Sequence, residues 1–140
     1  MFEHSTTQRV RYGETDQMGF VYYGNYALYY EVGRVEALRA LGLTYRSLEE
    51  KGIIMPVVRL DAKYIQPAQY DDLIHIHTAI KELPSRFITF HVTISNEANQ
   101  LLHKAKVILC FRDLQRDCLI STPEEIISRL KPYLGHQTIK

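Results

Sequence analysis

Alternation of apolar and polar residues with a period of two dominates the second half of the chain and limits the folds open to it. Four such segments follow one another at residues 54–65, 71–83, 86–96 and 101–113; the third reads RFITFHVTISN. A period of two is the side-chain period of a β-strand, so each segment is predicted to be a strand with one face in a core. Short polar turns join the segments, which predicts an antiparallel meander.

A single long helical pattern precedes these strands. It should begin near Asn25, a residue favoured at helix N-caps, and end at Gly42, which suits the left-handed position after a helix. Apolar residues cover much of its circumference, which predicts a largely buried helix. One stripe at helical spacing consists of Tyr26, Tyr30, Gly33, Ala37 and Ala40, and a second consists of Leu28, Val32 and Val35.

The order of elements predicts one α+β domain over residues 1–140. A short strand at 6–13 comes first; a second short helix at 44–51 follows the long helix, and a C-terminal helix at 122–133 follows the four strands. One sheet face carries apolar residues, so the simplest arrangement is a curved antiparallel sheet wrapped around the long helix. Such a sheet leaves free edges, which predicts pairing of at least two subunits.

Composition places the chain among ordinary globular proteins. The hydrophobic fraction is 46%, enough for a core without disulfides or metal. A formal net charge of +1 argues against nucleic-acid binding, which needs a basic surface. No apolar stretch approaches the roughly 20 residues that span a bilayer, and the N-terminus lacks a signal-peptide pattern. We therefore expect a cytoplasmic protein without membrane insertion.

Cysteines and histidines show no pattern typical of metal or redox chemistry. Cys110 and Cys118 lack the Cys-x-x-Cys spacing, and Cys110 lies in an apolar run typical of a buried thiol. His75 and His77 share one face of a predicted strand, but no third ligand is evident. We expect no metal site.

The stretch YGETDQMGFVYYGNY at 12–26 places acidic residues in a glycine-containing turn directly before the long helix. Glu14 and Asp16 precede Gly19 and Gly24, and glycine permits tight backbone turns beside a ligand. The N-terminus of a helix presents unpaired N–H groups and a partial positive charge. By spacing alone, Asp16 fits a turn-forming carboxylate as well as a catalytic one.

This stretch, extended to RVRYGETDQMGFVYYGNYALYYEVGRVEALRALG, resembles the N-terminal signature of hotdog-fold acyl-CoA thioesterases. The similarity is greatest to the 4-hydroxybenzoyl-CoA thioesterase-like group, which includes enzymes associated with the Tol–Pal system. It continues through AKYIQPAQYDDLIHIHT and covers nearly the whole chain. The resemblance implies a long central helix wrapped by a five-stranded antiparallel sheet, dimers that often form tetramers, and an active site between subunits. It implies an acyl-CoA substrate, no cofactor and no metal.

The matching motif also assigns roles to individual residues. Asp16 would be the catalytic carboxylate, the backbone N–H of Tyr23 would bind the thioester oxygen, and Gly19 would permit the turn between them. Side chains that could contact the substrate are Tyr22, Asn25, Arg59 and Arg86. The two arginines would contact coenzyme A phosphates, although charges on strand faces are often only solvated, and Asn25 is first of all an N-cap.

Hydrolysis of an acyl-CoA to a free acid and coenzyme A is the leading hypothesis, and two others compete with it. Hydration or dehydration of an acyl thioester occurs on the same fold, but related enzymes use a histidine with an aspartate in a different motif. A domain that binds an acyl thioester without turnover is the third. The acyl preference, the choice between nucleophile and general base for Asp16, and the choice between dimer and tetramer stay open.

Overall fold

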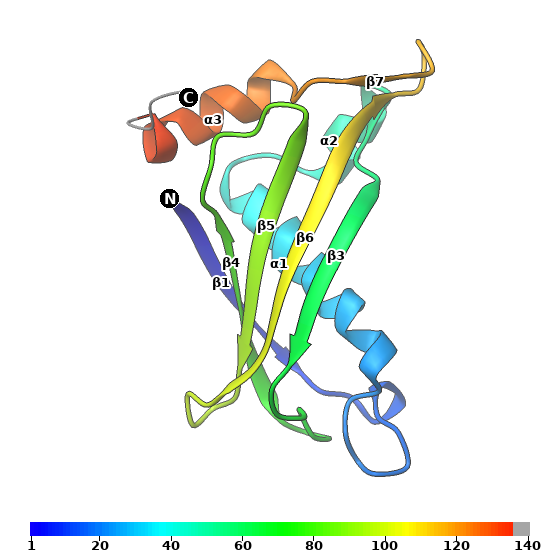
Figure 1. Cartoon of the computed structure of the whole chain (residues 1–140), viewed down its shortest axis with the longest axis vertical. Coiled ribbons are helices and arrows are strands. Elements are labelled where there is room, and N and C mark those ends of the chain that lie inside the picture. Colours follow the sequence, from blue (N-terminus) through cyan, green and yellow to red (C-terminus); the bar gives the residue numbers. More distant parts are fainter. Residues whose placement is uncertain (136–140) are drawn as a thin grey trace.

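A curved antiparallel sheet wraps around one long helix in the computed structural model, which describes residues 1–135 (Figure 1). The long strands follow the order β1-β4-β5-β6-β3, and the short β2 and β7 pair with the far end of β6. The predicted α+β architecture is thereby confirmed. The elements are β1 (Phe2–Arg9), η1 (Tyr12–Glu14), η2 (Tyr23–Asn25), α1 (Tyr26–Ala40), α2 (Tyr45–Glu50), β2 (Ile53–Ile54), β3 (Val57–Tyr64), β4 (Leu73–Ile80), β5 (Phe87–Ser95), β6 (Leu101–Asp113), β7 (Cys118–Ile120) and α3 (Glu124–Leu134).

The predicted four-strand meander is wrong at one junction. β4, β5 and β6 do follow one another as antiparallel neighbours, but β3 pairs with β6 and lies at the opposite edge from β4. The connection 65–72 crosses the open end of the sheet: the N–H of Ile65 donates to Leu102 O at 3.0 Å, and that of Asp71 donates to Val10 O at 3.1 Å. Alternation identifies a strand but does not identify its pairing partner.

The first strand begins earlier than its pattern predicted. β1 spans Phe2–Arg9 instead of 6–13, and it pairs with β4 along its whole length. Just past the end of the strand the N–H of Val10 bonds to Asp72 O at 2.8 Å, and the chain then enters the turn η1.

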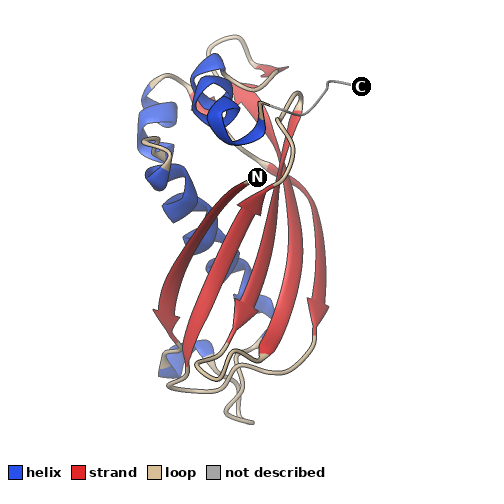
Figure 2. Ribbon diagram, turned by 90° about the vertical axis from the view of Figure 1, so that its left-hand side faces the viewer, coloured by secondary structure: helices blue, strands red, loops and turns tan. Residues whose placement is uncertain are grey.

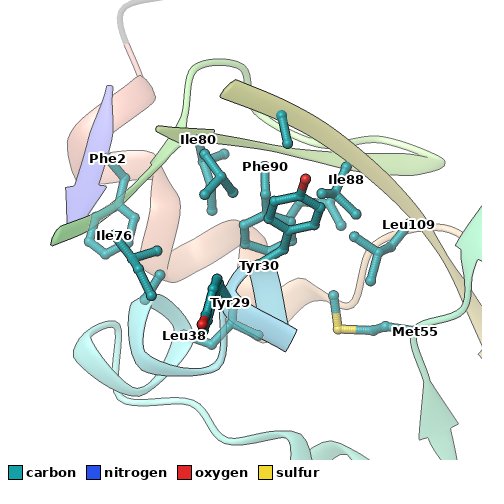
Figure 3. Close-up of a cluster of buried hydrophobic side chains, with 14 of the residues drawn as sticks. Phe2, Tyr29, Tyr30, Leu38, Met55, Ile76, Ile80, Ile88, Phe90 and Leu109 are labelled. Atoms are coloured by element: carbon teal, nitrogen blue, oxygen red, sulfur yellow. The ribbon is translucent and has the colours of Figure 1, made fainter. Parts of the chain in front are cut away.

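The core lies between α1 and the inner face of the sheet. Tyr30 and Leu38 from α1 pack against Ile76 from β4 and Phe90 from β5, and all four are buried (Figure 3). α1 approaches the sheet closely at Gly33, where a β-carbon would lie 2.5 Å from the hydroxyl oxygen of Thr78. Only a residue without a side chain lets the backbone of the helix approach the sheet this closely.

The prediction that α1 is buried over much of its circumference is wrong. Leu28 is 51% exposed, and Ala40 is exposed as well. Val32 and Val35 line a surface pocket with Leu28 and are only partly buried, although Val32 also packs against the core. Figure 2 shows α1 along one face of the sheet, so one layer of strands covers only one side of it. The apolar pattern identified the helix but not the extent of its cover.

The ends of the helices follow the local sequence only in part. Gly42 adopts the predicted left-handed conformation with φ of +83° after α1. Thr44 caps α2 and accepts a hydrogen bond from the N–H of Ser47 at 3.0 Å, as predicted. Thr122 does not cap α3, because its hydroxyl donates to Ser85 O at 2.7 Å instead.

The two ends of the sheet are built differently. We call residues 10–25 together with 65–72 the loop end, and α2, β2, β7 and α3 together the capped end; they lie at the bottom and top of Figure 1. Within residues 1–135, no helix has the length and apolar character needed to cross a membrane.

Candidate active site

A tight turn at the loop end fixes the position of Asp16. The N–H of Asp16 donates to Phe20 O at 2.8 Å, and the N–H of Gly19 donates to Asp16 O at 3.0 Å. Gly19 has φ of +78°, a conformation that side chains disfavour. Gly19 therefore acts through its backbone conformation, which lets the chain turn tightly after Asp16.

The carboxylate of Asp16 is held through one of its oxygens. Oδ1 accepts the N–H of Met18 at 2.9 Å and the N–H of Phe20 at 3.3 Å, and the side chain is half-buried. For the second oxygen, Oδ2, the structure of residues 1–135 gives no hydrogen-bond partner. The turn thus orients the group and leaves one oxygen for a ligand or a water molecule.

The entrance of α1 supplies backbone donors next to this carboxylate. The turn η2 (Tyr23–Asn25) leads into the helix, and its first closed hydrogen bond runs from Asn25 N–H to Tyr22 O at 2.8 Å. The N–H groups of Tyr23 and Gly24 precede that bond, in positions where helical turns leave donors unsatisfied. The partial positive charge of the helix start adds to their attraction for a negative oxygen.

Asp16 and Tyr23 line the same cleft. Its volume is about 260 Å³, close to the small end of the range for ligand sites. Phe20 and Tyr26 form an apolar wall on the core side, and Tyr64 at the end of β3 belongs to the same lining. The cleft brings one carboxylate and one set of backbone donors to an otherwise largely apolar surface, which suits a reaction that develops charge on a carbonyl oxygen.

Glu14 anchors the loop that carries Asp16. Its Oε1 accepts the hydroxyl of Tyr29 at 2.9 Å and the N–H of Arg11 at 2.8 Å. Burial, and then the neighbouring Glu14 carboxylate, raise the pKa of Tyr29 well above its usual value, so this hydroxyl stays protonated and donates. Of the two acidic residues in the predicted turn, Glu14 therefore has a structural role: it accepts hydrogen bonds that hold the loop in place.

Asn25 organises the same loop and does not act as a helix cap. It occupies the predicted position before α1, but its side chain makes no capping bond. Its Nδ2 donates instead to the backbone oxygen of Glu14 at 2.9 Å. Asn25 is absent from the lining of the cleft in the described chain, so its predicted contact with substrate stays a prediction.

The remaining candidates lie outside the cleft of the single chain. The exposed ring of Tyr22 packs on that of Tyr23 with centroids 4.8 Å apart. Arg59 is exposed on β3 and pairs with Asp61 at 3.1 Å. Arg86 lines a different cavity at the capped end. The chain therefore brings Asp16 and the Tyr23 backbone together and keeps both arginines apart from them.

Two residues next to the cleft were missed by the sequence analysis. The hydroxyl of Tyr64 donates to Tyr23 O at 2.9 Å, and buried His103 lies opposite Tyr64 in the β3–β6 ladder. Burial lowers the pKa of His103 to about 4. Alternation placed Tyr64 on the apolar face of its strand, but only the β3–β6 pairing brings these two side chains together.

The histidine pair on β4 is not part of a larger ligand set. His77 Nε2 lies 3.1 Å from Glu3 Oε1, across the β1–β4 pair. In the portion of the chain that the structure describes, no group of three or more His, Cys, Asp or Glu side chains is placed to hold a metal ion.

Comparisons with known proteins identify the family of the chain. The family model described as Thioesterase superfamily matches residues 18–103. The putative acyl-CoA thioesterase YneP of Bacillus subtilis is 40% identical over 96 residues, which cover 69% of this chain and 70% of that protein. The acyl-CoA thioester hydrolase YbgC of Escherichia coli O157:H7 is 30% identical over 123 residues, 88% of this chain and 92% of that one. The crystal structure of the DHNA-CoA thioesterase of Staphylococcus aureus superposes with a TM-score of 0.82 at 29% identity, covering 96% of this chain and 85% of that one.

Proposed function

Because the chain belongs to the thioesterase superfamily, we propose that it is an acyl-CoA thioesterase, which hydrolyses a thioester to a free acid and coenzyme A. The observation that supports this most directly is the cleft of about 260 Å³ that both Asp16 and Tyr23 line. Thioester hydrolysis requires a carboxylate near the carbonyl carbon and a donor near the carbonyl oxygen. The hotdog fold of the chain positions both on the segment that enters α1.

The proposed reaction begins with the acyl carbonyl bound between these groups. Its oxygen faces the N–H of Tyr23 at the start of the helix, and its carbon faces the unpaired oxygen of Asp16. As the carbon becomes tetrahedral, negative charge develops on the oxygen, and a donor of this kind typically contributes about 2.7–4 kcal/mol to lowering the barrier. The carbon–sulfur bond then breaks, and the thiolate of coenzyme A leaves and takes up a proton.

Asp16 can perform the attack in either of two ways. As a nucleophile it forms a mixed anhydride, which water then hydrolyses; as a general base it removes a proton from the water that attacks. A single turnover in heavy-oxygen water, quenched so that any acyl-enzyme anhydride is trapped, distinguishes them. The nucleophilic route places the label on the Asp16 carboxylate or in the acid according to which anhydride carbon water attacks, whereas the general-base route labels only the acid.

We propose that the complete site includes a second copy of the chain. All eight residues of β3 are exposed, and the end of this strand lines the cleft. Antiparallel pairing of two copies of β3 about a two-fold axis reverses one strand, which brings its Val57 end near Tyr64 of the other. Arg59 of the partner subunit would then lie near the cleft, in reach of the coenzyme A phosphates. A tetramer and a cytoplasmic location remain predictions.

The test is a thiol-release assay over short, long and aromatic acyl-CoAs, with detection of the free acid. Asp16→Asn keeps an oxygen that can accept the two loop N–H groups, so the turn is preserved while the base or nucleophile is lost. We expect the turnover number kcat to fall by about 10²–10⁴. The matched control is Asp117→Asn, an exposed aspartate at φ of +51° beside β7, a conformation that asparagine tolerates well.

The same assay separates the competing functions. A domain that only binds acyl thioesters gives binding without thiol release, and a hydratase adds water to an unsaturated acyl chain while the thioester stays intact. Full turnover in Asp16→Asn would show that the catalytic carboxylate has been assigned wrongly.

A further inference from the structure

Tyr64 connects the edge strand of the sheet to the entrance of α1. Its hydroxyl donates to the backbone oxygen of Tyr23 at 2.9 Å, across 41 positions of sequence. Tyr64 is the last residue of β3, and its side chain forms part of the cleft lining.

The acceptor of this bond is the carbonyl oxygen of Tyr23, the residue whose N–H is the proposed donor to the substrate. Tyr23 O and the N–H of Gly24 are parts of one planar peptide group, so fixing the oxygen also fixes the direction of that N–H. The N–H of Tyr23 lies on the other side of the same α-carbon, and its direction depends on the same turn. A hydrogen bond at the oxygen therefore restrains both donors at the helix start.

The aromatic core holds the Tyr64 ring in place. The ring meets Tyr26 edge-on, with centroids 5.3 Å apart at 88°, and meets His103 at 4.7 Å and 78°. His103 in turn stacks on Tyr26 at 4.2 Å and 14°, and its Nε2 contacts the hydroxyl of Tyr30. Tyr26 and Tyr30 both belong to α1, so the helix itself and the strand pair β3–β6 determine where the Tyr64 hydroxyl lies.

From this geometry we infer that Tyr64 is a positioning residue of the active site, whose hydroxyl holds the Tyr23–Gly24 backbone in the orientation that binds the developing negative oxygen. The inference rests on the proposed thioesterase function. It adds a residue that does not itself react: the ring lines the cleft, while the hydroxyl acts on the substrate through the backbone. A tether with a merely structural role would instead stabilise the fold without changing the chemical step.

The experiment compares Tyr64→Phe with the wild type in the full-length protein, on an acyl-CoA that the wild type hydrolyses. The phenylalanine keeps the ring contacts and removes only the hydroxyl. Displacing a catalytic group by about 1 Å can lower the rate 10²-fold. For a loosened backbone unit we expect kcat to fall about tenfold while KM stays within about twofold. The acidic limb of the pH profile of kcat/KM should not move, because the carboxylate is unchanged.

Tyr70→Phe is the matched control. Tyr70 is also at the loop end and is 52% exposed, against 53% for Tyr64, but it does not line the cleft. Its variant should keep the kcat and KM of the wild type. A second test variant, Tyr64→Leu, also lacks the hydroxyl and should show at least the same fall in kcat, so a folding defect in one variant does not decide the result.

Three outcomes would overturn the inference. One is a kcat equal to that of the wild type in Tyr64→Phe. Another is a rise in KM at constant kcat, which would make Tyr64 only a wall of the binding cleft. The third is a wild type that hydrolyses no acyl-CoA, which would remove the proposed function as well. If the wild type is active, Asp16→Asn is inactive and Tyr64→Phe is fully active, only the role of Tyr64 is wrong.

Discussion

The loop end and the capped end of the molecule each enclose a cavity of similar size, but the linings of the two cavities differ. The cleft at the loop end has a volume of about 260 Å³ and is lined by Asp16 and Tyr23. The cavity at the capped end has about 250 Å³ and is lined by Phe87, Cys110 and the exposed Arg86, among others. The second cavity has no carboxylate and no helix start in its lining. Volume alone therefore does not identify an active site; convergent polar groups do.

Different forces hold the two ends together. At the loop end, directional hydrogen bonds from Tyr29, Asn25 and Tyr64 fix the backbone around the cleft. At the capped end, α2 and α3 bury apolar side chains such as Leu48 and Leu130, both 0% exposed. Hydrogen bonds fix orientation, whereas apolar burial fixes proximity and contributes most of the stability. Substitutions at the loop end should thus change activity more than stability, and substitutions at the capped end should do the reverse.

The largest effect on stability should follow from Leu48→Ala in α2. Removing a fully buried leucine side chain leaves a cavity and costs about 2–5 kcal/mol of unfolding free energy. We expect kcat per folded molecule to stay at the wild-type value, because α2 lies at the opposite end from the cleft (Figure 1). Urea denaturation at one fixed protein concentration measures the first quantity, and steady-state kinetics below the transition measures the second.

A loss of kcat in Leu48→Ala comparable to that of a loop-end variant would break the comparison. It would mean that the two ends respond as one unit, so that packing in α2 sets the geometry of the cleft. A solvent-facing change in the same helix, Glu49→Ala, is the matched control and should leave both quantities unchanged.

The sequence predicted the elements better than it predicted their neighbours. Alternation identified β4, β5 and β6 and the hairpin turns between them, because side-chain period is a local property. It placed β3 next to β4, since nothing within residues 54–65 indicates that the connection crosses the sheet to pair this strand with β6. For the same reason the helical pattern predicted that Leu28 is buried. The exposure of Leu28 depends on which element packs against that side of α1.

The residues of the candidate site likewise differ in whether a local sequence pattern could identify them. Asp16 and the Tyr23 backbone lie only seven positions apart, so one motif contains both, and the structure places them in one cleft. Tyr64 and His103 reach that cleft only through the β3–β6 register, which no local pattern encodes. The contacts predicted for Arg59 and Arg86 remain predictions, because the single chain keeps both side chains outside the cleft.

An intermediate effect should follow from Glu14→Ala, which tests whether hydrogen bonds hold the loop end. The variant removes the acceptor of the Tyr29 hydroxyl, and Tyr29 is only 1% exposed. An unsatisfied buried donor costs about 1–3 kcal/mol of unfolding free energy. We also expect kcat to fall about tenfold because the loop that carries Asp16 loosens. Denaturation curves and steady-state kinetics on the same preparation give both values.

The matched control is Glu125→Ala at the capped end. Glu125 pairs with Lys51 at 2.9 Å near the surface, and such pairs contribute about 0–1 kcal/mol. Its variant should keep full activity. Glu14→Gln, which retains an acceptor oxygen for Tyr29, should lose less stability than Glu14→Ala. If Glu14→Ala lowered stability but left kcat unchanged, hydrogen bonds at the loop end would not be what orients the catalytic groups.

The smallest effect near neutral pH is a dependence of stability on pH that originates beside the loop end. Burial lowers the pKa of His103 to about 4, below the value of about 6.5 for an unfolded chain. Between these values the unfolded chain binds a proton that the folded chain does not. Stability is therefore full above pH 6.5 and falls as the pH drops toward 4, with a slope of at most about 1.4 kcal/mol per pH unit for one proton. Urea denaturation at pH steps between 7 and 5 measures this slope.

His103→Gln should flatten the slope, since glutamine can still reach Tyr30 but does not titrate. The side chains that face the ring are Tyr26, Tyr30 and Tyr64, all neutral at these pH values, so no charged neighbour compensates for the proton. His91→Gln is the comparison variant: burial first, and then Lys81 and Lys106, lower the pKa of that outward-facing histidine too, so this variant should flatten the slope by a smaller amount. Equal slopes in the wild type and His103→Gln would show that the buried imidazole is not the acid-sensitive group. A larger loss of slope in His103→Gln than in His91→Gln would instead place the acid-labile point of the fold directly behind Tyr64, so that acid weakens the support of the cleft before it weakens the apolar packing of the capped end.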